Sequence, residues 1–399
     1  MINIKNNYNH TFYASYIGFI TQAIVNNFAP LLFLTFQRIY EIPLHQITLL
    51  ITINFGVQLT VDLFSVKFAD KIGYRPLMVF AHICAAIGLA GLGLFPLFFT
   101  EAYIGLLAAV IIYAIGGGLT DVLISPIVEA CPTVGKSAKM SLTHSFYCWG
   151  KVFVILGSTL FFIIFGIDNW KILAGIWALI PLVNTFYFSQ VPIFRLTDKN
   201  SSMRVRQLLS MKVFWIFVLL MICAAAAEIS MAQWASAFAE SEFGVSKTVG
   251  DLAGPLAFAI FMGIARVAYS KFSNKINLRA FMIYSGALSV TGYLLAALSP
   301  YPALSLIACG LCGLAAGILW PGTLSLAAER FPKGGTAIFA MLALAGHLGA
   351  LFGPTVVGFV SHMLEGNIRM GLLAAVVFPL LMTMLLLMYK RQDSNASTV

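Results

Sequence analysis

The chain has 399 residues, of which 60% are hydrophobic and 10% charged, and its mean hydropathy is +0.91. A soluble domain is about half apolar and about a quarter charged, so this composition excludes a water-soluble protein and predicts an all-α integral membrane protein. The formal charge of +9 does not indicate nucleic-acid binding, because the basic residues lie in the gaps between apolar runs.

Taken in chain order, the apolar runs predict twelve transmembrane helices, each long enough to cross a bilayer. The first run follows a short polar segment and is too long for the core of a signal peptide, so we expect it to be retained. The predicted spans are 12–36, 45–66, 77–97, 103–126, 140–166, 170–190, 213–239, 248–270, 279–299, 303–327, 335–362 and 370–389.

The longest polar interval separates the sixth and seventh spans. It predicts an N-terminal half of six helices (1–191), a cytoplasmic linker (192–212) and a C-terminal half of six helices (213–399). Most of the 24 Lys and Arg residues lie in alternate intervals, the linker included, which places both termini in the cytoplasm. The six cysteines lie in or beside apolar runs, and we expect neither a disulfide framework nor a metal, redox or cofactor site.

A short internal repeat relates the two halves. Lys67–Arg75 (KFADKIGYR) follows the second span, and Lys271–Arg279 (KFSNKINLR) follows the eighth. The two segments share Lys, Phe, Lys, Ile and Arg at equal spacing. The repeat predicts two pseudo-symmetric six-helix halves, as in transporters built from parallel repeats.

The first copy of this repeat resembles the loop signature of the major facilitator superfamily, G-x-x-x-D-(R/K)-x-G-(R/K)-(R/K). Asp70, Gly73 and Arg75 match it, and Val66 replaces its first glycine. The stretch Ser125–Gly150 and the Glu228 region are similar to the fucose-permease-like branch, whose members are often sugar–proton symporters. The resemblance implies the major facilitator fold, secondary active transport and a location in the plasma (inner) membrane.

Ionisable residues inside predicted spans require a functional or structural explanation, because placing a charge in hydrocarbon costs about 3 kcal/mol. Glu228 lies near the middle of the seventh span among small apolar residues, where a carboxyl can load and release a proton. The alternative is a structural carboxyl bonded to a neighbouring helix. Asp121 follows the glycine run Gly116–Gly118, which permits close helix approach. The resemblance implies proton coupling for Asp121, and a cytoplasmic gate is the alternative.

The fifth span carries a polar stripe. His144, Tyr147 and Lys151 lie on one helical face, which predicts that they line a water-filled cavity. Lys151 would then contact the substrate, or neutralise Asp121 or Glu228.

Five further residues are predicted to control conformation. Asp62 and Arg266 occupy equivalent positions in the two halves and carry opposite charges near the cytoplasmic ends of their spans, which favours gating over substrate binding. In the loop signature, Asp70 would pair at helix ends, Gly73 would permit the tight turn and Arg75 would pair across its half.

Uncharged side chains complete the candidate substrate site. Amides beside aromatic rings suit a sugar, which offers hydroxyls around an apolar ring face, although lone amides and tryptophans also bond between helices or anchor them. The candidates are Gln22 and Asn26 on the first span, Asn54 and Gln58 on the second, and Trp234, Trp320 and His347 in the C-terminal half.

Together these features favour a monomeric secondary transporter that takes up a sugar or a similar small polar solute with protons, by alternating access in a lipid bilayer. The alternative is a proton-coupled efflux antiporter for drugs or metabolites, although the glycine-proline signature expected in the fifth span of such proteins is absent. An enzyme is not expected, because the sequence contains no phosphate-binding loop, nucleophile–base pair or metal cluster.

Overall fold

A computed structural model describes residues 7–42, 44–196, 203, 205–245, 250, 252–365 and 367–396, and these residues contain helices and no β-strand. Residues 197–202 and 204 of the predicted linker lie outside the described part, as do the side chains of Val66 and Lys67. The described chain forms two compact units.

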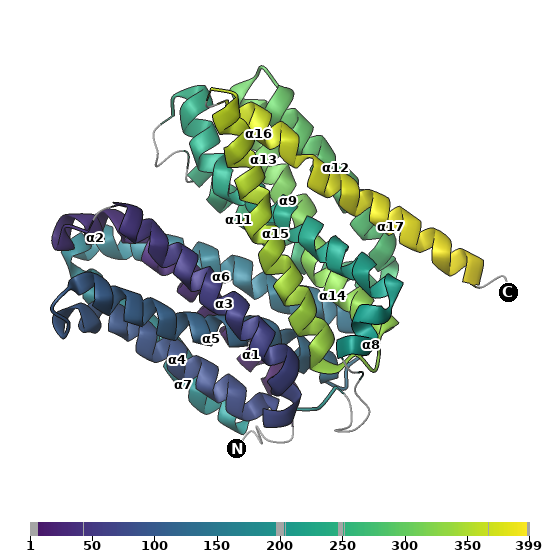
Figure 1. Ribbon diagram of the computed structural model, residues 1–399, viewed down its shortest axis with the longest axis horizontal. Helices are drawn as coiled ribbons and strands as arrows, with labels where there is room; N and C mark the ends of the chain where they lie inside the picture. Colours follow the sequence, from purple (N-terminus) through teal and green to yellow (C-terminus); the bar gives the residue numbers. More distant parts are fainter. Residues whose placement is uncertain are drawn as a thin grey trace. The chain divides into compact units, whose positions relative to one another are not determined.

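The first unit comprises Met1–Thr133, Phe146–Met203 and Lys333–Ala340. Within it, α4 packs along both α5 and α7, while α1 and α3 pack against α5 (Figure 1). Its helices are α1 (Asn9–Leu31), α2 (Phe33–Tyr40), α3 (Leu44–Ile72), α4 (Tyr74–Leu94), η2 (Phe95–Leu97), α5 (Ala102–Ala130), most of α6 (Lys136–Phe165), η3 (Ile167–Asn169) and α7 (Trp170–Gln190).

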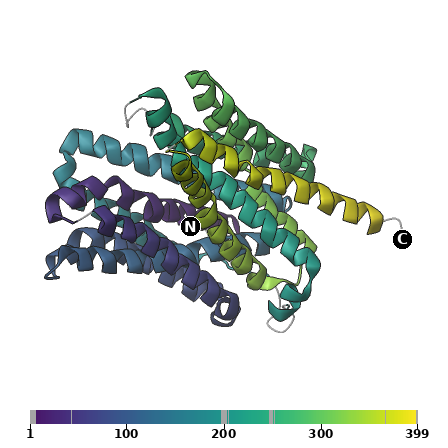
Figure 2. The ribbon, with the colours of Figure 1, turned by 45° about the horizontal axis from the view of Figure 1, so that its top comes forward.

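The second unit comprises Val134–Ser145, Arg204–Pro332 and Met341–Val399. Within it, α12 packs against α13 and α17, and α9 packs against α13 and α17 (Figure 2). Its helices are α8 (Val205–Ser210), α9 (Lys212–Phe243), η4 (Leu252–Leu256), α11 (Ala257–Phe272), η5 (Ser273–Lys275), α12 (Leu278–Leu298), α13 (Pro302–Ala316), α14 (Leu319–Arg330), most of α15 (Gly335–Met363), α16 (Ile368–Ala375) and α17 (Val377–Ala396).

Two helices are divided between the units. The first turns of α6 belong to the second unit, and the first turns of α15 belong to the first unit. These helices begin the fifth and eleventh predicted spans, so the exchange occurs at equivalent places in the internal repeat.

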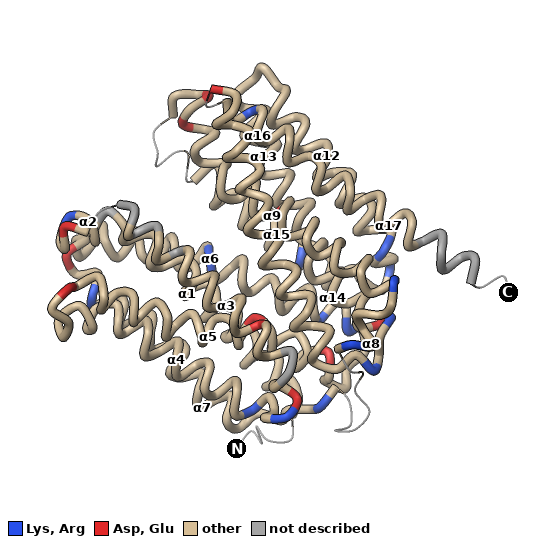
Figure 3. Tube along the Cα trace, viewed as in Figure 1, with Lys and Arg blue, Asp and Glu red and all other residues tan. Residues whose placement is uncertain are grey.

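Ten helical segments of the described chain are long and apolar enough to cross a membrane. The other two predicted spans correspond to α1 with α2 and to α3. Charged residues gather near helix ends and are sparse along helix middles (Figure 3), as expected where the middles face hydrocarbon.

Three predicted spans, the first, the tenth and the twelfth, are interrupted. The tenth span divides at Gly317 and Ile318, and the twelfth divides at Val376. A proline lacks the N–H that would bond the carbonyl four residues earlier, so Pro321 and Pro379 weaken the helix at these points. The first span divides just after Pro30, and the eighth begins with the π-helical η4.

Candidate functional site

Four amide side chains form one hydrogen-bonded cluster between α1 and α3 in the first unit, which we call the amide cluster. Gln22 donates from Nε2 to Gln58 Oε1 at 3.1 Å. Gln58 donates from Nε2 to Asn26 Oδ1 at 2.9 Å and to Asn54 Oδ1 at 3.1 Å. Asn54 in turn donates from Nδ2 to Asn26 Oδ1 at 3.2 Å. The structure therefore brings together the four amides that the sequence placed on two separate spans.

The amide cluster keeps unused hydrogen-bonding capacity. Gln22 is only 2% exposed, and its Oε1 has no hydrogen-bond partner within the described part of the chain. A buried acceptor without a partner is costly, so this oxygen is suited to accept from a water molecule or from a bound hydroxyl.

A run of three glycines on α5 makes room for the cluster. Because successive helical residues point about 100° apart, each glycine faces a different helix. A Cβ on Gly116 would collide with the α4 backbone, and one on Gly118 would lie 3.0 Å from the Val61 side chain on α3. A Cβ on Gly117 would lie 2.8 Å from Gln22 Oε1. The run thus lets α5 approach α4, α1 and α3 together.

A small cavity of about 20 Å³, which is room for about one water molecule, lies beside the amide cluster. Asn26 and Asn54 contribute its polar wall, and none of its described lining residues is charged. The remaining lining residues are Val25, Ala29, Pro30, Phe33, Leu50, Phe55 and Tyr113. Its lining is mostly apolar with two amides, which suits a neutral group better than a charged one.

Glu228 forms a buried ion pair in the second unit. It lies in the middle of α9, and its Oε2 is 3.5 Å from Nη2 of Arg266 on α11. The two side chains are 10% and 3% exposed, respectively. From the sequence, Glu228 had small apolar neighbours along its own helix and Lys151 or a neighbouring helix as candidate partners, and its pairing with Arg266, 38 residues away, was not predicted.

Arg266 also bonds two backbone carbonyls. Its Nε donates to Gly317 O and its Nη1 to His144 O, both at 2.8 Å. The Ser141 hydroxyl on α6 donates to the carbonyl of Arg266 itself at 2.8 Å. Arg266 was predicted as a gating residue from its equivalence to Asp62. The structure pairs it with Glu228, the predicted proton site on α9, and its gating role stays a prediction.

The predicted stripe on α6 divides between the two units. His144 is buried in the second unit, whereas Tyr147 and Lys151 are partly exposed in the first. Asp62 on α3 is fully buried, and Asp121 on α5 is partly exposed. Their proposed contacts with substrate or protons stay predictions.

The two candidate tryptophans fit against glycines of α15 in the second unit. The Trp320 ring occupies the space where a Cβ on Gly346 would stand, and the Trp234 ring does the same at Gly358. Trp234 also donates from Nε1 to Pro354 O at 3.1 Å. Helix packing accounts for these contacts. His347 is partly exposed on the same helix, and a substrate role for all three residues stays a prediction.

The loop signature joins helix ends of the first unit. The Thr336 hydroxyl, in the first turn of α15, donates to Asp70 Oδ1 and lies 2.6 Å from the Tyr74 hydroxyl. Gly73 has a φ of +98°, a conformation that favours glycine. Arg75 donates to Ser189 O and Val191 O at the end of α7, where a cation is favourable.

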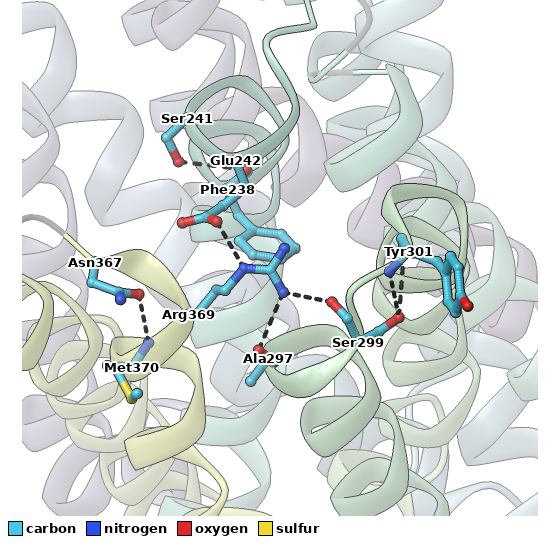
Figure 4. Close-up of polar contacts among 9 residues, drawn as sticks. All are labelled: Phe238, Ser241, Glu242, Ala297, Ser299, Tyr301, Asn367, Arg369 and Met370. Atoms are coloured by element: carbon cyan, nitrogen blue, oxygen red, sulfur yellow. Dashed lines mark hydrogen bonds and ion pairs between the residues drawn. The ribbon is translucent and has the colours of Figure 1, made fainter.

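Sequence reasoning missed Arg369, which joins three helices in the second unit (Figure 4). Its Nε donates to Glu242 Oε2 on α9 at 2.7 Å, and its Nη1 donates to Ser299 O at 2.7 Å and Ala297 O at 3.3 Å at the end of α12. The signal was present: Arg369 is one of few basic residues in the intervals predicted to be extracellular. We call these contacts the Arg369 clamp.

Comparison with known proteins supports the fold. The family model described as "Major Facilitator Superfamily" matches residues 14–354 and 242–398. No curated protein sequence matches the chain.

Solved transporter structures match along nearly the whole chain. The E. coli fucose:proton symporter FucP has 16% identity and a TM-score of 0.76, covering 94% of this chain and 97% of its own. The proton:xylose symporter XylE, bound to 6-bromo-6-deoxy-D-glucose, has 12% identity and a TM-score of 0.82, covering 96% and 95%. A bacterial homologue of the iron transporter ferroportin has 11% identity and a TM-score of 0.75, covering 96% and 99%. At these identities the likeness concerns the fold.

Proposed function

The chain belongs to the Major Facilitator Superfamily, and we propose that it takes up a sugar, or a similar small polar solute, together with protons. Membership makes it a membrane carrier rather than an enzyme. In carriers of this architecture, two six-helix halves alternately expose a central site to each side of the membrane. We further propose that it works as a monomer in the plasma (inner) membrane with both termini in the cytoplasm.

The amide cluster is the observation that carries the choice of solute. Amides can both donate to and accept from hydroxyl groups, and the adjoining pocket offers apolar and aromatic surface without a charge. An anionic or cationic solute would find no opposite charge on this wall, whereas a neutral sugar would exchange hydrogen bonds with Asn26 and Asn54 and gain contact for its ring face. Both sugar symporters named above share the fold, which is consistent with this proposal.

Glu228 is the proposed proton site. It is the buried carboxylate in the middle of α9, and Arg266 compensates its charge. The ion pair with Arg266 stabilises the deprotonated form of the buried Glu228 carboxylate. The protonated form is neutral and therefore tolerates apolar surroundings. Asp121 on α5 is a second candidate for the same role.

Solute-induced charge movement tests the solute and the coupling together. Protein in liposomes on a solid-supported electrode would receive hexoses, deoxyhexoses and disaccharides without a pH gradient. We expect a transient current for at least one neutral sugar, unchanged when sodium is removed. If correctly folded protein gives no current with any sugar of the panel, or gives a current with organic anions only, the proposed solute class is contradicted. Substrate-specific resistance on overproduction would favour efflux instead.

Replacing Glu228 by Gln tests the proton site. The amide keeps the size of the side chain but cannot exchange a proton, so Glu228→Gln should lose accumulation driven by a pH gradient and keep solute exchange. Glu242→Gln on the same helix is the matched control, because Glu242 belongs to the Arg369 clamp, and it should still accumulate solute. Accumulation by Glu228→Gln at the wild-type level would refute the assignment.

A further inference from the structure

The cavity beside the amide cluster has room for one oxygen atom. Its volume of about 20 Å³ matches a single water molecule, so it can receive one small group of a larger solute. The cavity lies where four helices of the first unit meet, and its polar lining includes Asn26 on α1 and Asn54 on α3. The hydrogen-bonding groups at this place decide which group of a solute fits.

The two asparagines offer N–H groups. Asn26 Oδ1 already accepts from Gln58 and from Asn54, which uses both of its lone pairs. Rotating the Asn26 amide alone would set its nitrogen against these two donors, so its neighbours fix its orientation. Asn26 Nδ2 has no hydrogen-bond partner within the described part of the chain, and Asn54 Nδ2 uses one of its two protons on Asn26. Both nitrogens can therefore donate to a ligand.

The backbone of α1 supplies an acceptor at the same place. Pro30 lies inside α1 and has no N–H to donate to the carbonyl four residues earlier, which is that of Asn26. Helical carbonyls point towards the C-terminal end of the helix, so this oxygen points towards Pro30, which also lines the cavity. A buried carbonyl is normally paired, so Asn26 O is suited to accept from a group in the cavity.

A hydroxyl group is the chemical complement of this set. It accepts through its lone pairs and donates its proton, so it can bond the amide N–H groups and the Asn26 carbonyl together. An ether oxygen or a fluorine atom can accept but cannot donate, and a hydrogen atom or a methyl group does neither. A site whose buried polar groups are left unpaired discriminates strongly against a solute that lacks the hydroxyl.

We propose that this cavity is a subsite that binds one hydroxyl group of the solute, and that Pro30 is a positioning residue that keeps the Asn26 carbonyl available to it. This inference rests on the proposed function in taking the solute to be a sugar. It goes further in assigning one hydroxyl of that sugar to three atoms, which are Asn26 Nδ2, Asn54 Nδ2 and Asn26 O. A sugar that is deoxygenated at this position is a poor substrate.

Competition by sugar analogues tests the subsite. The sugar that gives a current in the electrode assay is compared with analogues in which one hydroxyl at a time is replaced by fluorine or by hydrogen. At one position, fluorine should raise the half-inhibitory concentration about tenfold, through loss of the donated bond, and hydrogen about tenfold more. Equal inhibition by the three forms at every position would overturn the inference.

Pro30→Ala separates the acceptor from the donors. Alanine supplies the missing N–H, so the helix satisfies Asn26 O and both amides remain. The hydroxyl and fluorine forms should then inhibit within about twofold of each other, while the hydrogen form stays weaker. Pro181→Ala is the matched control, because it removes a helix proline of α7 that does not line the cavity, and it should keep the wild-type order. An unchanged gap between hydroxyl and fluorine in Pro30→Ala would overturn the inference.

Asn54→Leu provides a second variant that acts on the donors. Leucine has a similar size but donates no hydrogen bond, so the gap between the fluorine and hydrogen forms should narrow at that position and at no other. A gap of the wild-type size in Asn54→Leu would equally contradict the subsite.

Failure of this inference is distinguishable from failure of the proposed function. If a sugar is transported but the order of its analogues does not respond to Pro30→Ala or Asn54→Leu, sugar uptake stands and the hydroxyl subsite falls. If no sugar of the panel gives a current, both fall.

Discussion

The ion pairs of Arg369 and Arg38 can be compared to test how burial sets the strength of an ion pair. Arg38 bonds Asp168 at 3.1 Å with side chains 62% and 85% exposed. Arg369 bonds Glu242 at 2.7 Å, and both side chains are 22% exposed. Arg369 also bonds two carbonyls at the end of α12 and lies over the rings of Phe238 and Phe243.

Arg369→Ala should cost far more stability than Arg38→Ala. Hydrogen bonds to a charged group contribute about 1.5–3 kcal/mol each. Removing the Arg369 side chain also leaves the carboxylate of Glu242, which is 22% exposed, without its cation. Allowing for partial solvent screening, we expect the free energy of unfolding to fall by about 2–4 kcal/mol. An exposed pair contributes about 0–1 kcal/mol, so Arg38→Ala should be almost silent.

Thermal unfolding in detergent provides the measurement. For a chain of this length, 1 kcal/mol corresponds to about 1 °C in Tm, so Arg369→Ala should lower Tm by about 2–5 °C and Arg38→Ala by less than about 1 °C. Arg369→Lys should lie between them, since lysine keeps the charge but loses the forked geometry. Equal shifts for the two alanine variants would show that burial and the carbonyl bonds do not govern the strength of the clamp.

Two further predictions concern the first unit. Gly117→Ala should displace the flexible end of the Gln22 side chain. The loss of one hydrogen bond should then raise the KM for solute about tenfold. Gly56→Ala on α3 is the control, because a Cβ there meets open space, and it should change KM less than about twofold. An unchanged KM in Gly117→Ala would remove the amide cluster from the solute site. Asn184→Leu breaks the bond of 2.8 Å to His82 and should lower the free energy of unfolding by about 2–4 kcal/mol. A wild-type Tm would contradict that expectation.

Hydropathy predicted the helical content well, because in a bilayer a long apolar helix is the favoured way to satisfy the hydrogen-bonding groups of the backbone. The interruptions of the tenth and twelfth spans were visible in principle, since Pro321 and Pro379 stand three residues beyond the residues where the helices break. Hydropathy averaged over a window cannot register them, because it counts side-chain polarity and ignores the missing N–H.

The candidate site was harder to predict than the fold. The amide cluster follows from spacing along two neighbouring spans, and all four members were identified. Arg266 was identified as a gating candidate, but its pairing with Glu228 was not predicted, because contacts across α6, α9 and α11 depend on tertiary packing. Arg369 was not identified as a site residue, because its bonds to α9 and to the end of α12 depend on tertiary packing, although a basic residue in an interval predicted to be extracellular is uncommon.

The glycine run on α5 has a consequence for genetic suppression. Gly116 faces backbone, Gly117 a flexible side-chain end and Gly118 a valine side chain. A larger residue at Gly116 should resist rescue by any single second substitution, because no side chain can be trimmed there. Damage at Gly118 should be rescued only in part by a smaller residue at Val61, because a Cβ there would also lie 3.1 Å from the Gln58 Cα. At Gly117, compensating changes should fall at Gln22 and alter solute preference as they restore growth.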